Sequence, residues 1–261
     1  MSPRASMAKR VRCAIGWRPG VQKTHVSERR GTRMANSKPG RATLGRLAAC
    51  AAATAIATAC GGSSPPGDAF LTRAERTDYQ ETSSYADVVD FLQRAAASSP
   101  SVHYTTYGYT TEGRALPLAV VGDIPDPSPA SVWLSGKTVV YLQGNIHAGE
   151  VCGKEALQML LRDLLAGRHG QWHESMVLLI APIYNADGNE RVTLTNRGRQ
   201  HGPFGGMGQR PNAQGYDLNR DHMKLESSEA RSVARLFNVY DPHVAVDLHT
   251  TNGTQHAYHL T

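Results

Sequence analysis

Residues 138–150 read TVVYLQGNIHAGE, an apolar run that ends in a histidine and a glutamate three positions apart. The β-branched and aromatic residues at 139–142 are followed by a Gly-Asn pair, a pattern that predicts a buried strand ending in a turn. The leucines of residues 150–165 share one helical face, which predicts a helix directly afterwards. His147 and Glu150 therefore lie where a strand passes into a helix, and open α/β sheets place their sites at such strand ends.

An imidazole and a carboxylate at a helix entrance can both turn toward one point, and one nitrogen and one oxygen donor suit Zn2+. The spacing of His147 and Glu150 is by itself weak evidence for a metal site, because His and Glu three residues apart also occur as capped or solvated pairs on protein surfaces. A metal site at this position therefore depends on support from other motifs.

Strand and helix patterns alternate along the chain on both sides of this stretch. The alternation predicts an α/β fold, with a mostly parallel mixed sheet and helices on both faces. We expect residues 110–114 to form a hairpin turn, residues 125–129 a surface loop, and residues 191–219 a long functional loop. The strand patterns cover residues 102–109, 116–121, 139–142, 176–183 and 244–248, and the helix patterns cover residues 84–97, 150–165 and 227–240.

The charge of the chain is divided unevenly between its two parts. The formal net charge is +6, but residues 1–60 carry 12 lysines and arginines against one acid. The remaining 201 residues carry 16 basic against 21 acidic side chains, so the part that folds is acidic. No basic stripe with interleaved aromatic residues is left in this part of the sequence, and we expect no nucleic-acid partner.

Residues 34–60 have the order of an export signal. A basic segment up to Arg46 precedes an Ala-rich apolar stretch at 47–59, and Cys60 follows. This order resembles a bacterial lipoprotein signal peptide, which implies a lipid anchor on Cys60 and an exported, membrane-anchored protein in the periplasm or at the cell surface. Cys50 matches the usual Leu-Ala-Ala-Cys box better, but no apolar stretch precedes it. The 13 residues from 47 to 59 are too few to span a membrane, which takes roughly 20.

Four motifs follow one another in the rest of the chain, each at or just beyond an element boundary. They are HAGE at 147–150, NADGNE at 185–190, DLNRD at 217–221 and DLHT at 247–250. Together they resemble the M14 family of zinc metallocarboxypeptidases. The resemblance covers about residues 80–261 and implies a zinc-carboxypeptidase fold, peptide or protein C-termini as substrates, and a zinc-activated water as nucleophile.

The resemblance also implies a ligand set. It makes His147, Glu150 and His249 the protein ligands of one Zn2+, with a fourth position for water. Asp217 matches the carboxylate that hydrogen-bonds a ligand histidine and fixes its tautomer. Only His249 ends an apolar strand, and we expect no metal ligand among the other histidines of this part, which include His201, His222, His243, His256 and His259.

Three further residues match positions that contact the substrate. Asn219 and Arg220 match the pair that binds the terminal carboxylate, for which a guanidinium and an amide donor are chemically suited. Arg210 matches the arginine that stabilises the oxyanion of the tetrahedral intermediate. Arg197 could share that role or belong to a subsite, and either arginine could instead brace the loop.

The sequence departs from the family pattern in two places. Ala186 stands where relatives have proline, a mild change in a turn. The family's general base, a glutamate on a later strand, has no counterpart before Thr261. We therefore expect the first two-thirds of a catalytic domain, whose peptidase activity needs the rest. Six glutamates do not fit the base position, since we expect none of them at a strand end that faces the ligands: Glu112, Glu155, Glu174, Glu190, Glu226 and Glu229.

These inferences divide the chain into three parts. Residues 1–60 hold an N-terminal extension and the signal segment, residues 61–79 a Ser/Pro/Gly tether, and residues 80–261 the catalytic domain. Cys152 is then the cysteine left in the fold, and we expect it to be buried. Two other functions remain open: an N-acyl amino acid deacylase of the aspartoacylase type, and an inactive lipoprotein that binds peptides or glycans.

Overall fold

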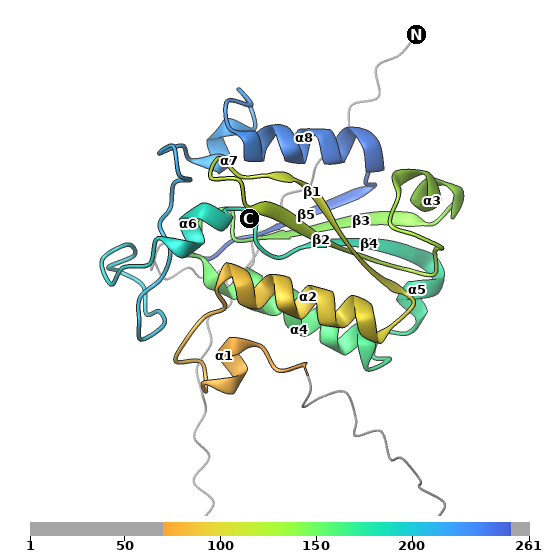
Figure 1. Cartoon of the computed structure of the whole chain (residues 1–261), viewed down its shortest axis with the longest axis horizontal. Coiled ribbons are helices and arrows are strands. Elements are labelled where there is room, and N and C mark those ends of the chain that lie inside the picture. The colour runs from red at the N-terminus through yellow and green to blue at the C-terminus, as the bar shows by residue number, and fades with distance from the viewer. Residues whose placement is uncertain (1–69, 252–261) are drawn as a thin grey trace, which may run out of the picture. The chain divides into compact units, whose positions relative to one another are not determined.

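A five-stranded mixed sheet forms the centre of the described part of the chain, residues 70–251 of a computed structural model (Figure 1). The strand order is β1-β2-β4-β3-β5. β3 is parallel to both β4 and β5, whereas β2 is antiparallel to both of its neighbours. All strands except β2 thus run in one direction, which confirms the mostly parallel mixed sheet. The strands are β1 (Val102–Tyr109), β2 (Ala115–Val121), β3 (Thr138–Gly144), β4 (Met176–Ala181) and β5 (Val244–Leu248).

Helices cover both faces of this sheet, as predicted (Figure 1). One apolar cluster packs α2 and α4 against one face, and a second packs α3 and α8 against the other. Within residues 70–251, no helix has the length and apolar character needed to cross a membrane. The helices are α1 (Arg73–Arg76), α2 (Tyr85–Ser98), α3 (Pro129–Leu134), α4 (Val151–Leu165), α5 (Gln171–Ser175), α6 (Ala186–Glu190), α7 (Leu218–Asp221) and α8 (Ser228–Tyr240).

Local signals explain where the predicted elements begin and turn. Ser84 caps α2, with its hydroxyl accepting from the Asp87 backbone N–H while the Asp87 carboxylate accepts from Ser84. Ser227 caps α8 in the same manner, accepting from the Ala230 N–H. Between β1 and β2, Gly113 adopts φ +80°, which a residue with a Cβ rarely does. These features fall within a residue or two of the predicted boundaries.

Several short elements were not predicted, or were predicted with different ends. α3 follows directly on the predicted 125–129 loop, begun by a Ser128 cap and a proline in its first turn. α5 forms before β4, and β4 ends two residues earlier than expected because Pro182 has no N–H for the strand ladder. α1 lies inside the predicted tether, and Phe70 packs edge-on against Phe91 of α2, so the folded part begins before residue 80.

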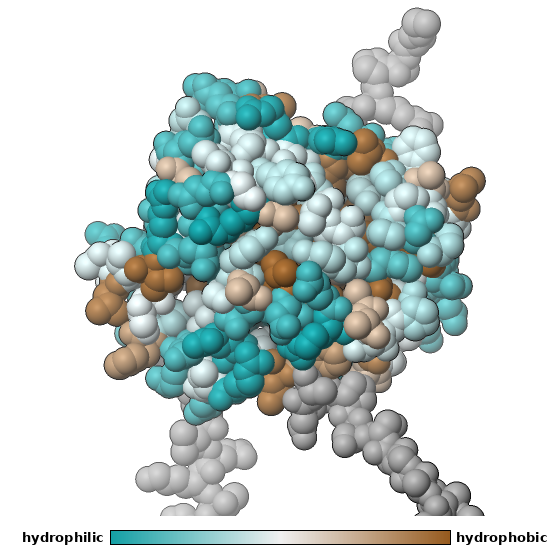
Figure 2. All heavy atoms as spheres, viewed as in Figure 1, coloured by the Kyte–Doolittle hydropathy of each residue, from teal (hydrophilic) through white to brown (hydrophobic). Residues whose placement is uncertain are grey.

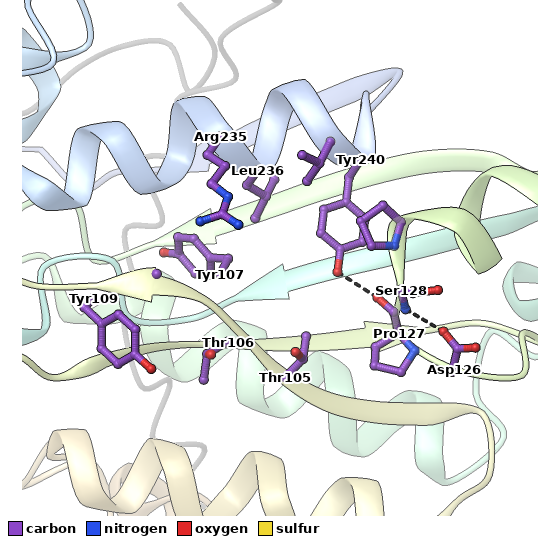
Figure 3. A pocket seen from close by; sticks show the side chains of 13 residues that line it. Thr105, Thr106, Tyr107, Tyr109, Asp126, Pro127, Ser128, Arg235, Leu236 and Tyr240 are labelled. Carbon is purple, nitrogen blue, oxygen red and sulfur yellow. Dashed lines mark hydrogen bonds between the residues drawn. The ribbon is translucent and has the colours of Figure 1, made fainter.

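The C-terminal end of α8 is fixed to the loop before α3. The Tyr240 hydroxyl donates to the Pro127 carbonyl over 2.7 Å, beside a groove that also receives Tyr107 from β1 and Arg235 from α8 (Figure 3). The left-handed Asp241 ends the helix, and β5 begins three residues later. β5 then pairs with β3 in parallel, with Val244 opposite Val140.

Two glycines allow α4 to lie directly on the ends of β3 and β5. A Cβ on Gly144 would come within 2.9 Å of the Gly153 backbone, and a Cβ on Gly153 within 2.8 Å of the Leu248 side chain. The start of α4 therefore approaches both strand ends more closely than larger residues would permit. This contact brings the segment after β3 next to the segment after β5.

Candidate active site

The turn between β3 and α4 has a fixed shape. Asn145 adopts the left-handed region at φ +65°, and its side-chain amide donates to the Ala148 carbonyl over 3.0 Å. The turn after β4 is tied to it, since the Asn185 N–H donates to the Asn145 carbonyl. His147 and Glu150 are thus carried by a braced turn at the carboxyl end of the sheet.

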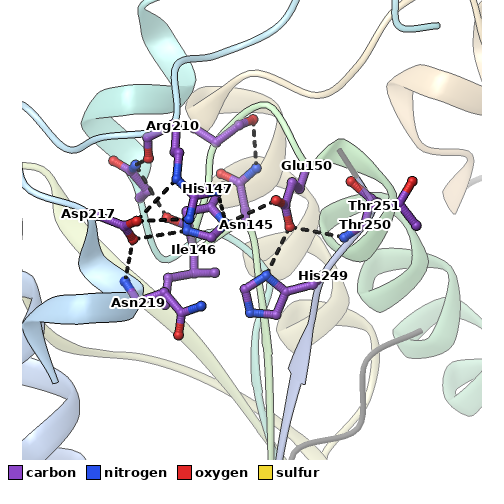
Figure 4. A network of polar contacts seen from close by, with 12 residues as sticks. Asn145, Ile146, His147, Glu150, Arg210, Asp217, Asn219, His249, Thr250 and Thr251 are labelled. Atoms are coloured by element: carbon purple, nitrogen blue, oxygen red, sulfur yellow. Dashed lines mark hydrogen bonds and ion pairs between the residues drawn. The ribbon is translucent and has the colours of Figure 1, made fainter. Parts of the chain in front are cut away.

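His147, Glu150 and His249 converge beyond the ends of β3 and β5 (Figure 4). Nδ1 of His147 lies 3.0 Å from one carboxylate oxygen of Glu150, and Nδ1 of His249 lies 3.0 Å from the other. One ligand atom from each of the three residues lies within 4.8 Å of the others, a group that can hold a metal ion. The structure therefore places the three predicted ligands together.

A separate carboxylate holds the second nitrogen of each histidine. His147 Nε2 lies 3.0 Å from Asp217, and His249 Nε2 lies 2.7 Å from Asp247. Because an ionised carboxylate can only accept, each Nε2 donates its proton to an aspartate, and each Nδ1 faces Glu150, to which it donates when it is protonated. With a cation in place of the Nδ1 protons, both Nδ1 atoms offer a lone pair. Two imidazole nitrogens and a carboxylate in this tautomeric state fit a zinc ion with an open position.

Electrostatics at this point favour a cation. Burial raises the pKa of Glu150, but hydrogen bonds from His147 and His249 outweigh it and hold that pKa well below its usual range. Burial lowers the pKa of His249, but its hydrogen bonds to Asp247 and Glu150 outweigh burial and raise the pKa to about 9. The carboxylates around His249 therefore favour positive charge at this point, and a divalent cation bound there would be favoured for the same reason.

Two arginines reach the site from the long loop between α6 and α7. Arg210 donates through Nε and Nη2 to Asp217, at 3.1 and 2.8 Å, and its Nη1 lies 3.4 Å from Nδ1 of His147. Arg197 donates to Glu150 over 2.9 Å, with only 9% of its side chain exposed. Gly149 leaves room for Arg197, since a Cβ on residue 149 would lie 2.6 Å from Cγ of Arg197. Both arginines thus contact the ligand group, which agrees with a functional loop.

The two residues predicted to bind the substrate carboxylate lie on α7, next to this group. The Asn219 N–H donates to Asp217 over 3.0 Å. Figure 4 shows Asn219 next to Asp217, in the same group of polar side chains as His147 and His249. Arg220 is exposed, with its guanidinium 3.5 Å from the Asn219 carbonyl.

The rest of the loop folds back on itself. Thr193 and Met207 form an antiparallel bridge, and the Phe204 N–H donates to the Gln80 carbonyl. Leu194 and Phe204 are 75% and 84% exposed. Hydrophobic side chains accordingly appear at the left edge of Figure 2, in the region of the cyan coil of Figure 1.

Residues set aside from the sequence have other contacts. Glu155 accepts from Ser83, Glu229 from Thr111, and Glu190 from the Tyr85 N–H, and none of these contacts involves His147 or His249. His243 accepts from the Val139 N–H, and His222 stacks on Tyr184, whereas His256 and His259 lie outside the described residues. The expectation for Cys152 is wrong. It is exposed, because α4 turns Gly153 and Lys154 toward the sheet instead.

Sequence reasoning missed Asp247 as the partner of His249. A strand repeats its side-chain direction every two residues, so Asp247 and His249 of the Asp-Leu-His motif face the same side. That alternation was the available signal. The Thr250 N–H, which donates to Glu150 over 3.0 Å, has no comparable signature, because any residue supplies a backbone N–H.

The family model described as zinc carboxypeptidase, Peptidase_M14, matches residues 88–251. The chain belongs to this family. The match spans all four motifs and all three candidate ligands, and the M14 family is zinc-dependent. Family membership therefore agrees with the donor set that the geometry shows.

Curated M14 relatives are similar over part of their length. Carboxypeptidase 2 of Trichophyton rubrum is 32% identical over 171 residues, which cover 61% of this chain and 27% of that protein. Carboxypeptidase D of Rattus norvegicus is 34% identical over 147 residues, covering 49% and 11%. The chain thus spans about a quarter or less of the length of these relatives.

Solved structures share the fold. A metallo-carboxypeptidase from Burkholderia cenocepacia superposes with a TM-score of 0.51 at 21% identity, covering 67% of this chain and 43% of that one. Carboxypeptidase A from Helicoverpa armigera gives a TM-score of 0.52 at 18% identity, covering 66% and 46%. The α/β architecture of this M14 protein is therefore that of zinc carboxypeptidases.

Proposed function

We propose that the protein is a zinc-dependent carboxypeptidase, which hydrolyses the last peptide bond of peptides or proteins. The observation that carries this proposal is the convergence of two imidazole Nδ1 atoms on one carboxylate, with each Nε2 held by an aspartate. Membership of the M14 family supports it, and favours it over the deacylase and over a binding protein without activity.

His147, Glu150 and His249 would hold the ion in this proposal. Bound zinc would act as a Lewis acid on the scissile carbonyl and lower the pKa of its water toward about 7. The residues of the chain prepare this chemistry. Asp217 and Asp247 keep both Nδ1 lone pairs directed at the ion, and Glu150 remains ionised over the whole physiological range because its pKa is held low.

Arg210 would stabilise the charge that develops on the substrate carbonyl. Its guanidinium lies beside Nδ1 of His147, and two hydrogen bonds to Asp217 hold it in place before substrate arrives. A donor that is already oriented does not have to reorganise as the charge forms. Asp217 would therefore orient both His147, through one carboxylate oxygen, and Arg210, through the other.

Asn219 and Arg220 would bind the terminal carboxylate of the substrate. Both lie on α7, immediately after Asp217, so a bound carboxylate would lie close to the metal site. Arg220 is exposed and can meet an anion that arrives from solvent. This arrangement favours substrates with a free C-terminus.

A pair of matched substrates tests the proposal. The zinc-loaded protein is expressed together with the C-terminal part of an M14 catalytic domain, which the family pattern predicts to carry the general base. It is incubated with an N-blocked peptide that has a free C-terminus and with the same peptide as its C-terminal amide. We expect release of the last residue from the acid alone, and a chelator should abolish it. Equal cleavage of the amide, or hydrolysis of N-acetyl amino acids in place of the peptide, would contradict a carboxypeptidase.

Arg220→Ala distinguishes recognition of the carboxylate from the chemical step. We expect the KM for the free-acid peptide to rise at least about tenfold, because a charge-assisted contact is lost. Arg235→Ala is the control, since that exposed arginine lies on α8 beside a different groove. An unchanged KM in Arg220→Ala would refute the assignment.

The proposed location is outside the cytoplasm, with a lipid anchor on Cys60. The basic, apolar and cysteine-terminated order of residues 34–60 supports it. These residues lie outside the part of the chain that the structure describes. A labelled fatty acid supplied to cells that express the full chain tests the anchor.

A further inference from the structure

A line of hydrogen bonds runs from the core of the protein to His249. The Tyr141 hydroxyl donates to Oε1 of Gln143 over 2.7 Å, and Nε2 of Gln143 donates to Oδ1 of Asp247 over 3.2 Å. The other oxygen of Asp247 accepts from Nε2 of His249. Gln143 and Asp247 are direct partners in the β3–β5 register, so the link crosses between neighbouring strands.

The direction of every bond in this line is determined. An ionised Asp247 offers only acceptors, so the Gln143 amide must turn its NH2 group toward it, which leaves its oxygen for the Tyr141 hydroxyl. The flipped amide would set its oxygen against the carboxylate and lose the contact with Asp247. Asp247 therefore receives two donors, one from Gln143 and one from His249.

The start of the line is firmly anchored. Tyr141 is 2% exposed, and its ring packs edge-on against Phe237 of α8, with the centroids 5.3 Å apart. Gln143 is 3% exposed, so water has little access to its amide. Asp247, in contrast, keeps 26% of its side chain exposed, and without Gln143 its carboxylate could rotate into solvent.

We propose that Gln143, itself held by Tyr141, is a positioning residue for the metal site. Its amide fixes the Asp247 carboxylate, and the carboxylate keeps the ring of His249 turned so that Nδ1 faces the ion. The inference rests on the proposed zinc site and adds to it a residue that touches neither metal nor substrate. It also gives a reason for a buried glutamine at the end of an otherwise apolar strand.

The test compares three variants of the full chain. Gln143→Met removes the amide while keeping the volume, Tyr141→Phe removes the hydroxyl that orients it, and Gln158→Met is the control. Gln158 is also a buried glutamine, but it donates to Ser83 and to the Lys154 carbonyl in α4. The Zn2+ dissociation constant is measured by competition with a chelator.

We expect zinc binding to weaken about tenfold in Gln143→Met, the lower end of the range for groups that orient metal ligands. Tyr141→Phe should weaken it about threefold, because one neutral hydrogen bond is lost. Gln158→Met should stay within about twofold of the wild type. In the zinc-loaded wild type, the Nε2–H proton of His249 should give a downfield NMR signal that moves upfield in the first two variants.

Wild-type zinc affinity and an unmoved His249 signal in both Gln143→Met and Tyr141→Phe would overturn the inference while leaving the zinc site intact. If Gln143→Met does not fold, Tyr141→Phe decides by the same two readouts. Absence of zinc binding in the wild type would refute the proposed site itself, and the inference with it.

Discussion

Asp217→Asn should weaken zinc binding even though the residue touches no metal. The carboxylate accepts from Nε2 of His147 on one oxygen and from Arg210 on the other, at 3.0 and 2.8 Å. Asparagine has the same shape but one acceptor instead of two, so its NH2 group must oppose either the imidazole N–H or the guanidinium. His147 or Arg210 then loses its fixed position.

The size of the effect follows from these contacts. A hydrogen bond to a charged group contributes about 1.5–3 kcal/mol, and each 1.4 kcal/mol is a factor of about ten in a dissociation constant. Because 27% of the Asp217 side chain is exposed, solvent screening favours the lower end of this range. We therefore expect zinc to bind about tenfold more weakly.

Asp221→Asn is the matched control. Asp221 is the last residue of α7, the short helix that Asp217 caps, but its carboxylate accepts from the N–H and hydroxyl of Ser227 and not from His147. Zinc affinity is measured by chelator competition and folding by thermal denaturation. Wild-type affinity in Asp217→Asn would refute the reasoning, as would an equal loss in Asp221→Asn.

Three further predictions concern catalysis, stability and export. Arg210→Ala should lower kcat about 100-fold with little change in KM, because the contact forms mainly in the transition state; a change in KM alone would contradict it. Burial lowers the pKa of Lys154 from 10.5 to about 8, so the unfolded chain binds more protons between these values. The free energy of unfolding should therefore gain a contribution that rises with pH from about 8 to about 10.5. Denaturant titrations at several pH values measure this rise, and Lys154→Met should lack it; an equal rise of the unfolding free energy with pH in Lys154→Met would show the reasoning to be wrong. Cys60→Ser should abolish fatty-acid labelling, whereas Cys50→Ser should not; the opposite result would move the anchor to Cys50.

The larger elements of the fold could be predicted because their periodicity is long and regular. The apolar runs of β3 and β4 and the leucine face of α4 leave little ambiguity. α3 and α5 have six and five residues, too few for a helical period to stand out. The start of α3 is set by the Ser128 cap and Pro129, and such residues are also common in loops.

The candidate ligands were predictable for a different reason. His147, Glu150 and His249 each follow an apolar strand, and the carboxyl ends of parallel strands meet at one edge of a sheet. The contacts that orient them depend on exact register and on the path of the long loop. The pairing of Gln143 with Asp247 and the approach of Arg197 to Glu150 are of this kind, and no local pattern encodes them.

The metal content of the purified protein tests the central claim most directly. We expect about one zinc ion per chain in the wild type, and almost none in the His147→Ala, His249→Ala double variant, because only Glu150 would remain of the three ligands. A folded double variant that still carries one equivalent of zinc would contradict the account.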